Sequence, residues 1–146
     1  MMLVKDLMST PVYSLNDTDT MLSARSLMTL HRIRHIPITD MDGVFVGLLT
    51  HRDVLAATIS QLADIEPETQ KEIDAGIPIM EVMRTDVRTV SLELPLREAA
   101  SILLEHKYGC LPVIAGGKLI GILTEADFLR LTIQLMDALD GSENAA

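Results

Sequence analysis

The chain lacks the features that mark secreted or membrane-spanning proteins. It has a single cysteine, Cys110, so it cannot form an internal disulfide. No apolar run reaches roughly 18 residues, the length that a membrane span requires. An acidic residue, Asp6, follows the opening residues before the apolar core of a signal peptide could form. We therefore expect a soluble, cytosolic protein that does not interact with membranes.

Basic residues are scarce as well. The chain carries 12 Lys and Arg against 21 Asp and Glu, a net charge of -9. This balance argues against nonspecific binding to nucleic acid or to anionic lipid, because both require a basic surface. The charge is uneven, since residues 1–60 hold five basic and six acidic residues while the remainder holds seven and fifteen. If the protein binds an anion, the first part of the chain is the expected host.

One motif occurs twice in the sequence. Residues 47–53 and 121–127 both follow the pattern Gly-h-h-Thr-x-x-Asp, where h is apolar. Each copy comes after an extended run with a central proline, Pro37 or Pro112. Because these residues return in the same order and at nearly constant spacing, the pattern predicts an internal duplication with two related sites.

The fold that we expect is α/β, because each copy alternates short extended runs with helical periodicity in the order β-α-β-β-α. Asp19 is the predicted N-cap of the helix in the first copy, and Gly109 the predicted end of the helix in the second. The expected boundaries are residues 1–60 and 79–139 for the two repeats and 140–146 for a flexible tail. Between the repeats, residues 61–78 are predicted to form a solvated acidic connector. A helix should end near Asp64 or Ile65, followed by an acidic turn or short helix and a break at Gly76 and Pro78.

With the duplicated motif, the h-Pro-h strands and the opening Met-x-Thr-x-Val segments in place, the sequence resembles a tandem cystathionine-beta-synthase (CBS) domain pair, also called a Bateman module. The resemblance implies two β-α-β-β-α CBS repeats packed sheet to sheet with pseudo-twofold symmetry. It also implies clefts that bind adenosine-containing ligands, a regulatory role and pairing into a homodimer.

The residues of the repeated motif suit such a ligand. A Thr at a helix entrance lies beside unpaired N–H groups where the helix dipole favours phosphate, and an Asp three residues later can accept both hydroxyls of a ribose. The family uses this Asp in that way, and its opening segments line the base pocket. The same Thr-x-x-Asp pattern is also a capping box that needs no ligand, and both roles can coexist. The candidate ligand-binding residues are Thr10, Pro11, Val12, Arg34, His35, Pro37, Thr50, His51, Arg52, Asp53, Thr85, Asp86, Val87, Pro112, Thr124 and Asp127.

The two copies differ in their basic residues. Arg34, His35, His51 and Arg52 surround the first motif, and we expect them to converge on one phosphate-binding cleft. The second copy has Gly109, Cys110, Glu125 and Ala126 at those places, so we expect its cleft to bind a nucleoside or to stay empty. A solvated cluster at a helix end is the alternative interpretation of the arginines.

The leading hypothesis is a sensor of AMP, ADP or ATP, with no obligatory cofactor, that regulates a separate, unidentified protein. S-adenosylmethionine or a nicotinamide dinucleotide would satisfy the same ribose chemistry. The alternative is a structural dimerisation module with vestigial clefts. We do not predict an enzyme, a catalytic residue or a metal site, because no nucleophile with a spaced base, metal-ligand cluster or phosphate-binding Gly-rich loop is visible, although His51 beside Asp53 could in principle act as a base.

Overall fold

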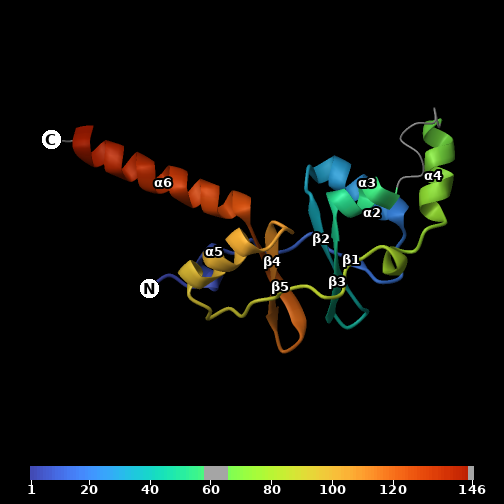
Figure 1. Ribbon diagram of the computed structural model, residues 1–146, viewed down its shortest axis with the longest axis horizontal. Helices are drawn as coiled ribbons and strands as arrows, with labels where there is room; N and C mark the ends of the chain where they lie inside the picture. The colour runs from blue at the N-terminus through green and yellow to red at the C-terminus, as the bar shows by residue number, and fades with distance from the viewer. Residues whose placement is uncertain (58–65, 145–146) are drawn as a thin grey trace. The chain divides into compact units, whose positions relative to one another are not determined.

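A computed structural model describes residues 1–57 and 66–144 of the 146-residue chain. These residues form six α-helices, five β-strands and one 3-10 helix (Figure 1). The mixed α/β fold class is confirmed. The helix end predicted near Asp64 or Ile65 falls outside the described residues.

The chain forms two compact units, which we name after the Asp of the repeated motif that each contains. The Asp127 unit comprises Met1–Pro11, Thr89–Ile114 and the chain from Ile120 onward. The Asp53 unit comprises Val12–Arg88 together with Ala115–Leu119. The opening eleven residues thus fold with the second repeat, a division that the sequence repeats do not reveal.

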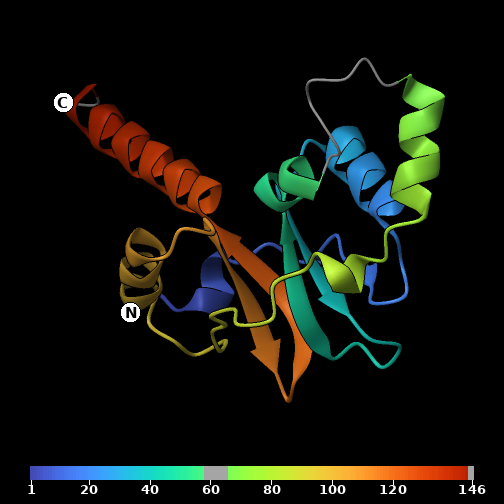
Figure 2. The same cartoon turned by 45° about the vertical axis from the view of Figure 1, so that its right-hand side comes forward.

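The Asp53 unit contains a three-stranded sheet of β1 (Leu15–Asn16), β2 (His35–Thr39) and β3 (Phe45–Thr50). β1 is parallel to β2, and β2 is antiparallel to β3 through a turn in which the Asp40 carboxylate accepts the N–H groups of Asp42 and Val44. Helix α2 (Met21–His31) packs against α3 (His51–Ala57) and against α4 (Pro67–Ala75), as Figure 2 shows. A short 3-10 helix, Ile79–Glu81, completes the unit. The buried core residues are Met21, Ala24, Met28, Ile36, Ile38, Leu49, Val54 and Ile79.

The hairpin of β4 (Cys110–Ala115) and β5 (Lys118–Thr124) belongs to the Asp127 unit except for its tip, Ala115–Leu119. Gly116 and Gly117 form its turn with φ of 58° and 79°, a left-handed conformation that glycine adopts without steric cost. Three helices complete the unit: α1 (Val4–Leu7), α5 (Leu96–Glu105) and α6 (Glu125–Asn144), which follows β5 directly. The buried core residues are Val4, Val90, Leu96, Ala99, Leu103, Leu111, Val113 and Leu123.

Each repeat supplies a segment to the unit of the other. Arg84, from the opening segment of the second repeat, pairs with Leu48 of β3 through two backbone hydrogen bonds of 2.8 and 2.9 Å. In the Asp127 unit, Ser9 pairs with Ile122 of β5 in the same way, at 2.8 and 3.1 Å. The equivalence of the two repeats therefore extends to this exchange.

Two predicted helix ends are wrong. Thr20, not Asp19, is the N-cap of α2, because the Asp19 carboxylate accepts the N–H of Asn16 in the preceding turn. Helix α5 ends at Glu105, and Gly109, with φ of 77°, instead precedes strand β4. In both cases the residue that predicted the helix end instead shapes the adjacent loop, Asp19 through its hydrogen bond to Asn16 and Gly109 through its positive φ.

Within the connector predicted at 61–78, the short helix and the break at Gly76 are confirmed and most described residues are exposed, but Asp74 is not solvated. Residues 67–75 form helix α4, and Asp74 at its end is only 2% exposed. The Asp74 carboxylate accepts hydrogen bonds from Arg25 Nε at 2.6 Å and from Gln70 Nε2 at 2.8 Å. Acidic composition predicts solvation, but an arginine of α2 supplies the counter-charge that allows burial.

The flexible tail predicted at 140–146 also differs from the structure. Helix α6 continues through Asn144, so most of the predicted tail is helical (Figure 1). Small polar residues at a chain end are typical of fraying, but here they extend a helix already nucleated in the Asp127 unit.

Candidate functional site

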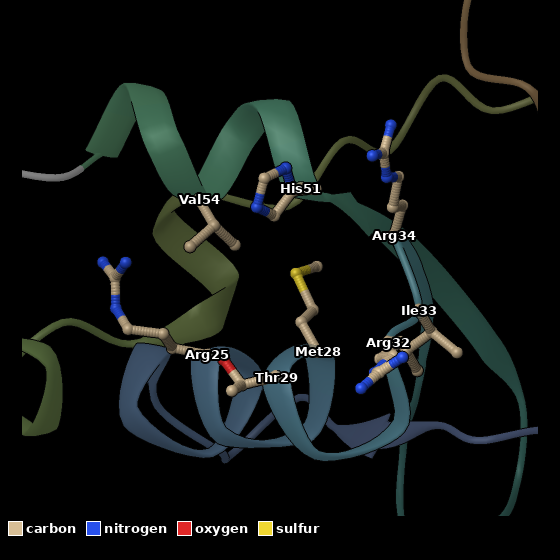
Figure 3. Close-up of a pocket in the computed structure, with 8 residues that line it drawn as sticks. All are labelled: Arg25, Met28, Thr29, Arg32, Ile33, Arg34, His51 and Val54. Carbon is tan, nitrogen blue, oxygen red and sulfur yellow. The ribbon is translucent and has the colours of Figure 1, made fainter.

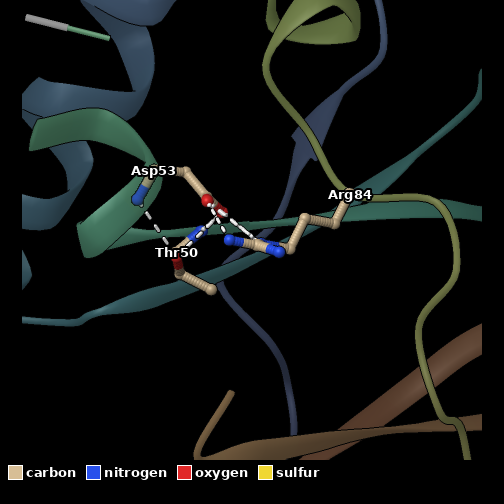
Figure 4. Close-up of polar contacts among 3 residues, drawn as sticks. All are labelled: Thr50, Asp53 and Arg84. Carbon is tan, nitrogen blue, oxygen red and sulfur yellow. Dashed lines mark hydrogen bonds and ion pairs between the residues drawn. The ribbon is translucent and has the colours of Figure 1, made fainter. Parts of the chain in front are cut away.

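Both copies of the repeated motif place Thr and Asp at the junction between a strand and a helix. Thr50 ends β3 and Asp53 lies in the first turn of α3, with 7% and 9% of their surfaces exposed. The Asp53 carboxylate accepts the Thr50 N–H at 3.0 Å and the Thr50 hydroxyl at 2.8 Å, and the Asp53 N–H donates to Thr50 Oγ1 at 3.2 Å (Figure 4). These reciprocal bonds are a capping box, the alternative role that the sequence leaves open.

Arg84 adds an ion pair to the Asp53 carboxylate. Its Nε lies 3.0 Å from Oδ1 and 3.2 Å from Oδ2, and its Nη2 lies 2.9 Å from Oδ1 (Figure 4). The backbone pairing of Arg84 with Leu48 brings this side chain to the motif, and Gly47 permits the close approach. A Cβ at position 47 would lie 2.9 Å from the Arg84 carbonyl oxygen and 2.6 Å from Met83 Sδ.

Thr124 and Asp127 repeat the capping box in the Asp127 unit. Asp127 Oδ2 accepts the Thr124 N–H at 2.8 Å and its hydroxyl at 3.2 Å. Its other oxygen accepts the Ser9 hydroxyl at 3.1 Å and Arg130 Nη2 at 2.8 Å. The cation thus comes from α6 itself, whereas the residue from the other repeat is a neutral serine.

The segments expected to line the base pockets meet the motif of the other repeat. Arg84 directly precedes Thr85, so residues 85–87 follow the single residue that pairs with β3, and Thr85 and Asp86 are exposed. Thr10 follows Ser9 beside β5, and its hydroxyl donates to the Ile120 carbonyl at 3.0 Å. Pro11 closes the Asp127 unit, and Val12 begins the Asp53 unit.

The remaining candidate positions are the two strand prolines, which are buried. Pro37 lies opposite Leu48 in the β2–β3 ladder, and the Pro112 carbonyl accepts the Val90 N–H at 3.0 Å. These positions shape the sheets that carry the motifs.

The four basic side chains predicted to surround the first motif do not all line the same pocket. Arg34 and His51 line a pocket of about 430 Å3 between α2 and α3, with the His51 ring above Met28 (Figure 3). His35 and Arg52 are not among its lining residues. Two arginines that sequence reasoning missed, Arg25 and Arg32, join it instead. The pocket is lined by Arg25, Met28, Thr29, Arg32, Ile33, Arg34, His51 and Val54.

Sequence signals could have located some of the missed cations. Arg32 lies in the run His31-Arg32-Ile33-Arg34, and its φ of 53° ends α2 so that the chain turns toward β2. His31 itself stacks on Tyr13 with a centroid distance of 4.1 Å. Arg130 lies three residues after Asp127, a spacing that brings both side chains to one face of a helix, whereas Arg84 carries no local signal because its partner Asp53 is 31 positions away.

The single thiol has an environment that suppresses ionisation. Cys110 is 1% exposed, and burial raises the pKa of its thiol to about 12. The neutral thiol is a poor nucleophile. Within residues 1–57 and 66–144, no group of three or more His, Cys, Asp or Glu could hold a metal ion, and no helix is long and apolar enough to cross a membrane.

The duplicated architecture matches a known family. The CBS domain profile matches the sequence at residues 4–60 and again at residues 79–133. The chain belongs to the CBS domain family. It is a tandem CBS pair, as the resemblance of the motifs implies.

Curated relatives of this CBS pair include the CBS domain-containing protein YhcV of Bacillus subtilis, which is 31% identical over 85% of this chain and 81% of its own length. A homoserine O-acetyltransferase of Methanocorpusculum labreanum is 29% identical, but the match spans only 23% of that enzyme. Enzyme names among the relatives therefore belong to much longer proteins.

Solved structures of similar proteins include one from Vibrio cholerae that carries the acetoin-utilization name AcuB, with 35% identity, a TM-score of 0.80 and coverage of 97% of both chains. The CBS-pair protein CBSX2 of Arabidopsis thaliana, solved in complex with AMP, is 27% identical with a TM-score of 0.77 over 93% of this chain and 99% of that one. The CBS pair of protein MJ0100, solved with 5′-methylthioadenosine and S-adenosyl-L-methionine, is 26% identical with a TM-score of 0.73 over 90% of this chain and 96% of that one.

Proposed function

We propose that this CBS pair is a regulatory module that binds an adenosine-containing ligand, with AMP, ADP or ATP the leading candidates, and signals to a separate protein. The observation that carries the proposal is the pair of buried carboxylates, Asp53 and Asp127, each at the entrance of a helix beside a Thr hydroxyl. A carboxylate in this position can accept two ribose hydroxyls, and the N-terminal N–H groups of the helix favour phosphate. The AMP and S-adenosylmethionine complexes of CBSX2 and MJ0100 support the same ligand class.

The Asp53 unit is the proposed host of a phosphate-bearing ligand. Arg34, Arg52 and His51 come from neighbouring positions at the start of β2 and α3, where the His51 N–H donates to the Arg34 carbonyl at 2.8 Å. In a chain with a net charge of -9, such a concentration of basic groups favours an anionic ligand. The Asp127 unit has Glu125 and Ala126 in place of His51 and Arg52, and it is proposed to bind a nucleoside or a less charged ligand.

Binding is tested by isothermal titration calorimetry with AMP, ADP and ATP on protein freed of copurified nucleotide. We expect Asp53→Ala to abolish one binding event and Asp127→Ala the other. Circular dichroism of both variants controls for folding. Absence of binding heat with every adenosine-containing ligand in the folded wild type would refute the proposal.

A homodimer is the second part of the proposal. Leu55 in α3 and Leu129 in α6 occupy equivalent positions of the two repeats and are 41% and 64% exposed. Helix α6 carries further exposed apolar residues: Ile133, Leu135, Met136 and Leu139, between 56% and 67% exposed. Exposed apolar surface of this kind marks a protein interface, and two copies of one chain supply it symmetrically.

The same apolar surfaces favour the alternative function, a dimerisation module with vestigial clefts. In that case the ion pairs of Asp53 with Arg84 and of Asp127 with Arg130 would be purely structural. Light scattering combined with the calorimetry separates the two functions, since a dimer that binds no nucleotide supports only the alternative.

A further inference from the structure

The Asp53 carboxylate is already saturated by protein donors. Its oxygens accept two hydrogen bonds from Thr50 and are bridged by the Arg84 guanidinium at 2.9 to 3.2 Å. A carboxylate offers about four acceptor positions, so two ribose hydroxyls cannot be accommodated while Arg84 remains in place. Ligand binding at Asp53 therefore requires the guanidinium to leave.

Asp127 presents a different obstacle. Its partner from the other repeat is the Ser9 hydroxyl at 3.1 Å, a neutral group that can rotate away without loss of an ion pair. Its cation, Arg130, extends from the surface of α6 with a side chain 65% exposed. Ser9 and Arg84 directly follow Met8 and Met83 at equivalent positions of the two repeats. A single repeat position thus distinguishes a neutral partner from a cationic one.

We infer that Arg84 makes the Asp53 site selective for adenosine ligands that carry phosphate, an inference that rests on the proposed nucleotide-binding function. When ribose hydroxyls take the carboxylate, a phosphate of the same ligand supplies the guanidinium with a new anionic partner. A neutral nucleoside breaks the ion pair of Arg84 with Asp53 and contributes no anionic group in exchange. Because the Arg84 side chain is 41% exposed, water offsets part of this loss, and selectivity of about fivefold is expected from this contact.

The test compares AMP with adenosine by calorimetry. In an Asp127→Ala background, binding is measured at the Asp53 site. Arg84→Ser then places at position 84 the serine that the first repeat carries at the equivalent position, Ser9. We expect adenosine affinity to rise about fivefold while AMP affinity does not rise. Arg84→Gln, which keeps hydrogen-bond donors without the charge, provides a second variant if Arg84→Ser does not fold.

The reverse exchange is the matched control. In an Asp53→Ala background, Ser9→Arg introduces a second cation next to Asp127, in addition to Arg130, and adenosine affinity there is expected to fall about fivefold. An unchanged ratio of AMP to adenosine affinity in folded Arg84→Ser or Arg84→Gln would overturn the inference while leaving nucleotide binding intact. Failure of the wild type to bind any adenosine ligand would overturn the proposed function, and the selectivity with it.

Discussion

Gly47→Ala tests whether the close approach of the exchanged segment to β3 holds the Asp53 site together. The new Cβ would lie 2.6 Å from Met83 Sδ and 2.9 Å from the Arg84 carbonyl oxygen. A methionine side chain can move, but the carbonyl cannot retreat without weakening both backbone hydrogen bonds between Leu48 and Arg84. Overpacking together with this loss should lower the free energy of unfolding by about 3 kcal/mol.

Gly121→Ala is the matched substitution in the other repeat. Its Cβ would meet Met8 Sδ at 2.6 Å but the Ser9 carbonyl oxygen only at 3.3 Å, so a rotation of Met8 relieves most of the strain. We expect a cost of about 1 kcal/mol from the same overpacking effect.

Urea unfolding measures both costs, and amide hydrogen exchange localises them. The Leu48 N–H, which donates to the Arg84 carbonyl at 2.9 Å, should exchange about thirtyfold faster in Gly47→Ala, corresponding to a local loss of about 2 kcal/mol. The Ile122 N–H, bonded to Ser9, reports on Gly121→Ala in the same way. Equal losses of stability for the two substitutions, or a larger loss for Gly121→Ala, would refute the explanation that the Arg84 carbonyl limits the space beside Gly47.

Three further outcomes are expected. Arg25→Ala should lower the free energy of unfolding by about 2 kcal/mol, more than Asp74→Ala. It leaves the 2% exposed Asp74 carboxylate without this cation, whereas the Arg25 side chain is 30% exposed and reaches water. Thermal melts in which Asp74→Ala costs more would contradict this expectation. Cys110 should resist iodoacetamide at pH 8 in the folded state and react once the protein is unfolded in urea. Because burial raises the pKa of its thiol from 9.0 to about 12, the contribution of Cys110 to stability is lost as the pH rises from about 9 toward 12. The difference in free energy of unfolding between wild type and Cys110→Ala should therefore narrow over that pH range. Leu55→Glu or Leu129→Glu should shift the proposed dimer toward monomer by light scattering, whereas Met41→Glu, at an 89% exposed turn position, should not.

Local order in the sequence was sufficient to place the strand-to-helix junctions of both repeats. The Gly-h-h-Thr-x-x-Asp pattern places Thr50 and Thr124 at the ends of strands and the helices directly after them, because capping residues and apolar periodicity act over a few residues. The capping bonds of Asp53 and Asp127 are likewise local, and both were anticipated as an alternative to ligand binding.

Only the tertiary structure decides which distant groups complete each site. Arg84 reaches Asp53 across 31 positions and Ser9 reaches Asp127 across 118, and Arg25 neutralises an Asp74 whose acidic neighbours predict solvation. The four basic residues predicted to converge on one cleft do not all do so, for the same reason. Arg34 and His51 line one pocket with Arg25 and Arg32, whereas His35 and Arg52 do not line it. Periodicity and motif spacing encode local geometry, but the pairing of strands and charges far apart in the chain depends on the packing of the whole unit. The sequence by itself thus determined two related Thr and Asp sites, and the fold decided that one carboxylate is held by an arginine of the other repeat and its counterpart by a serine.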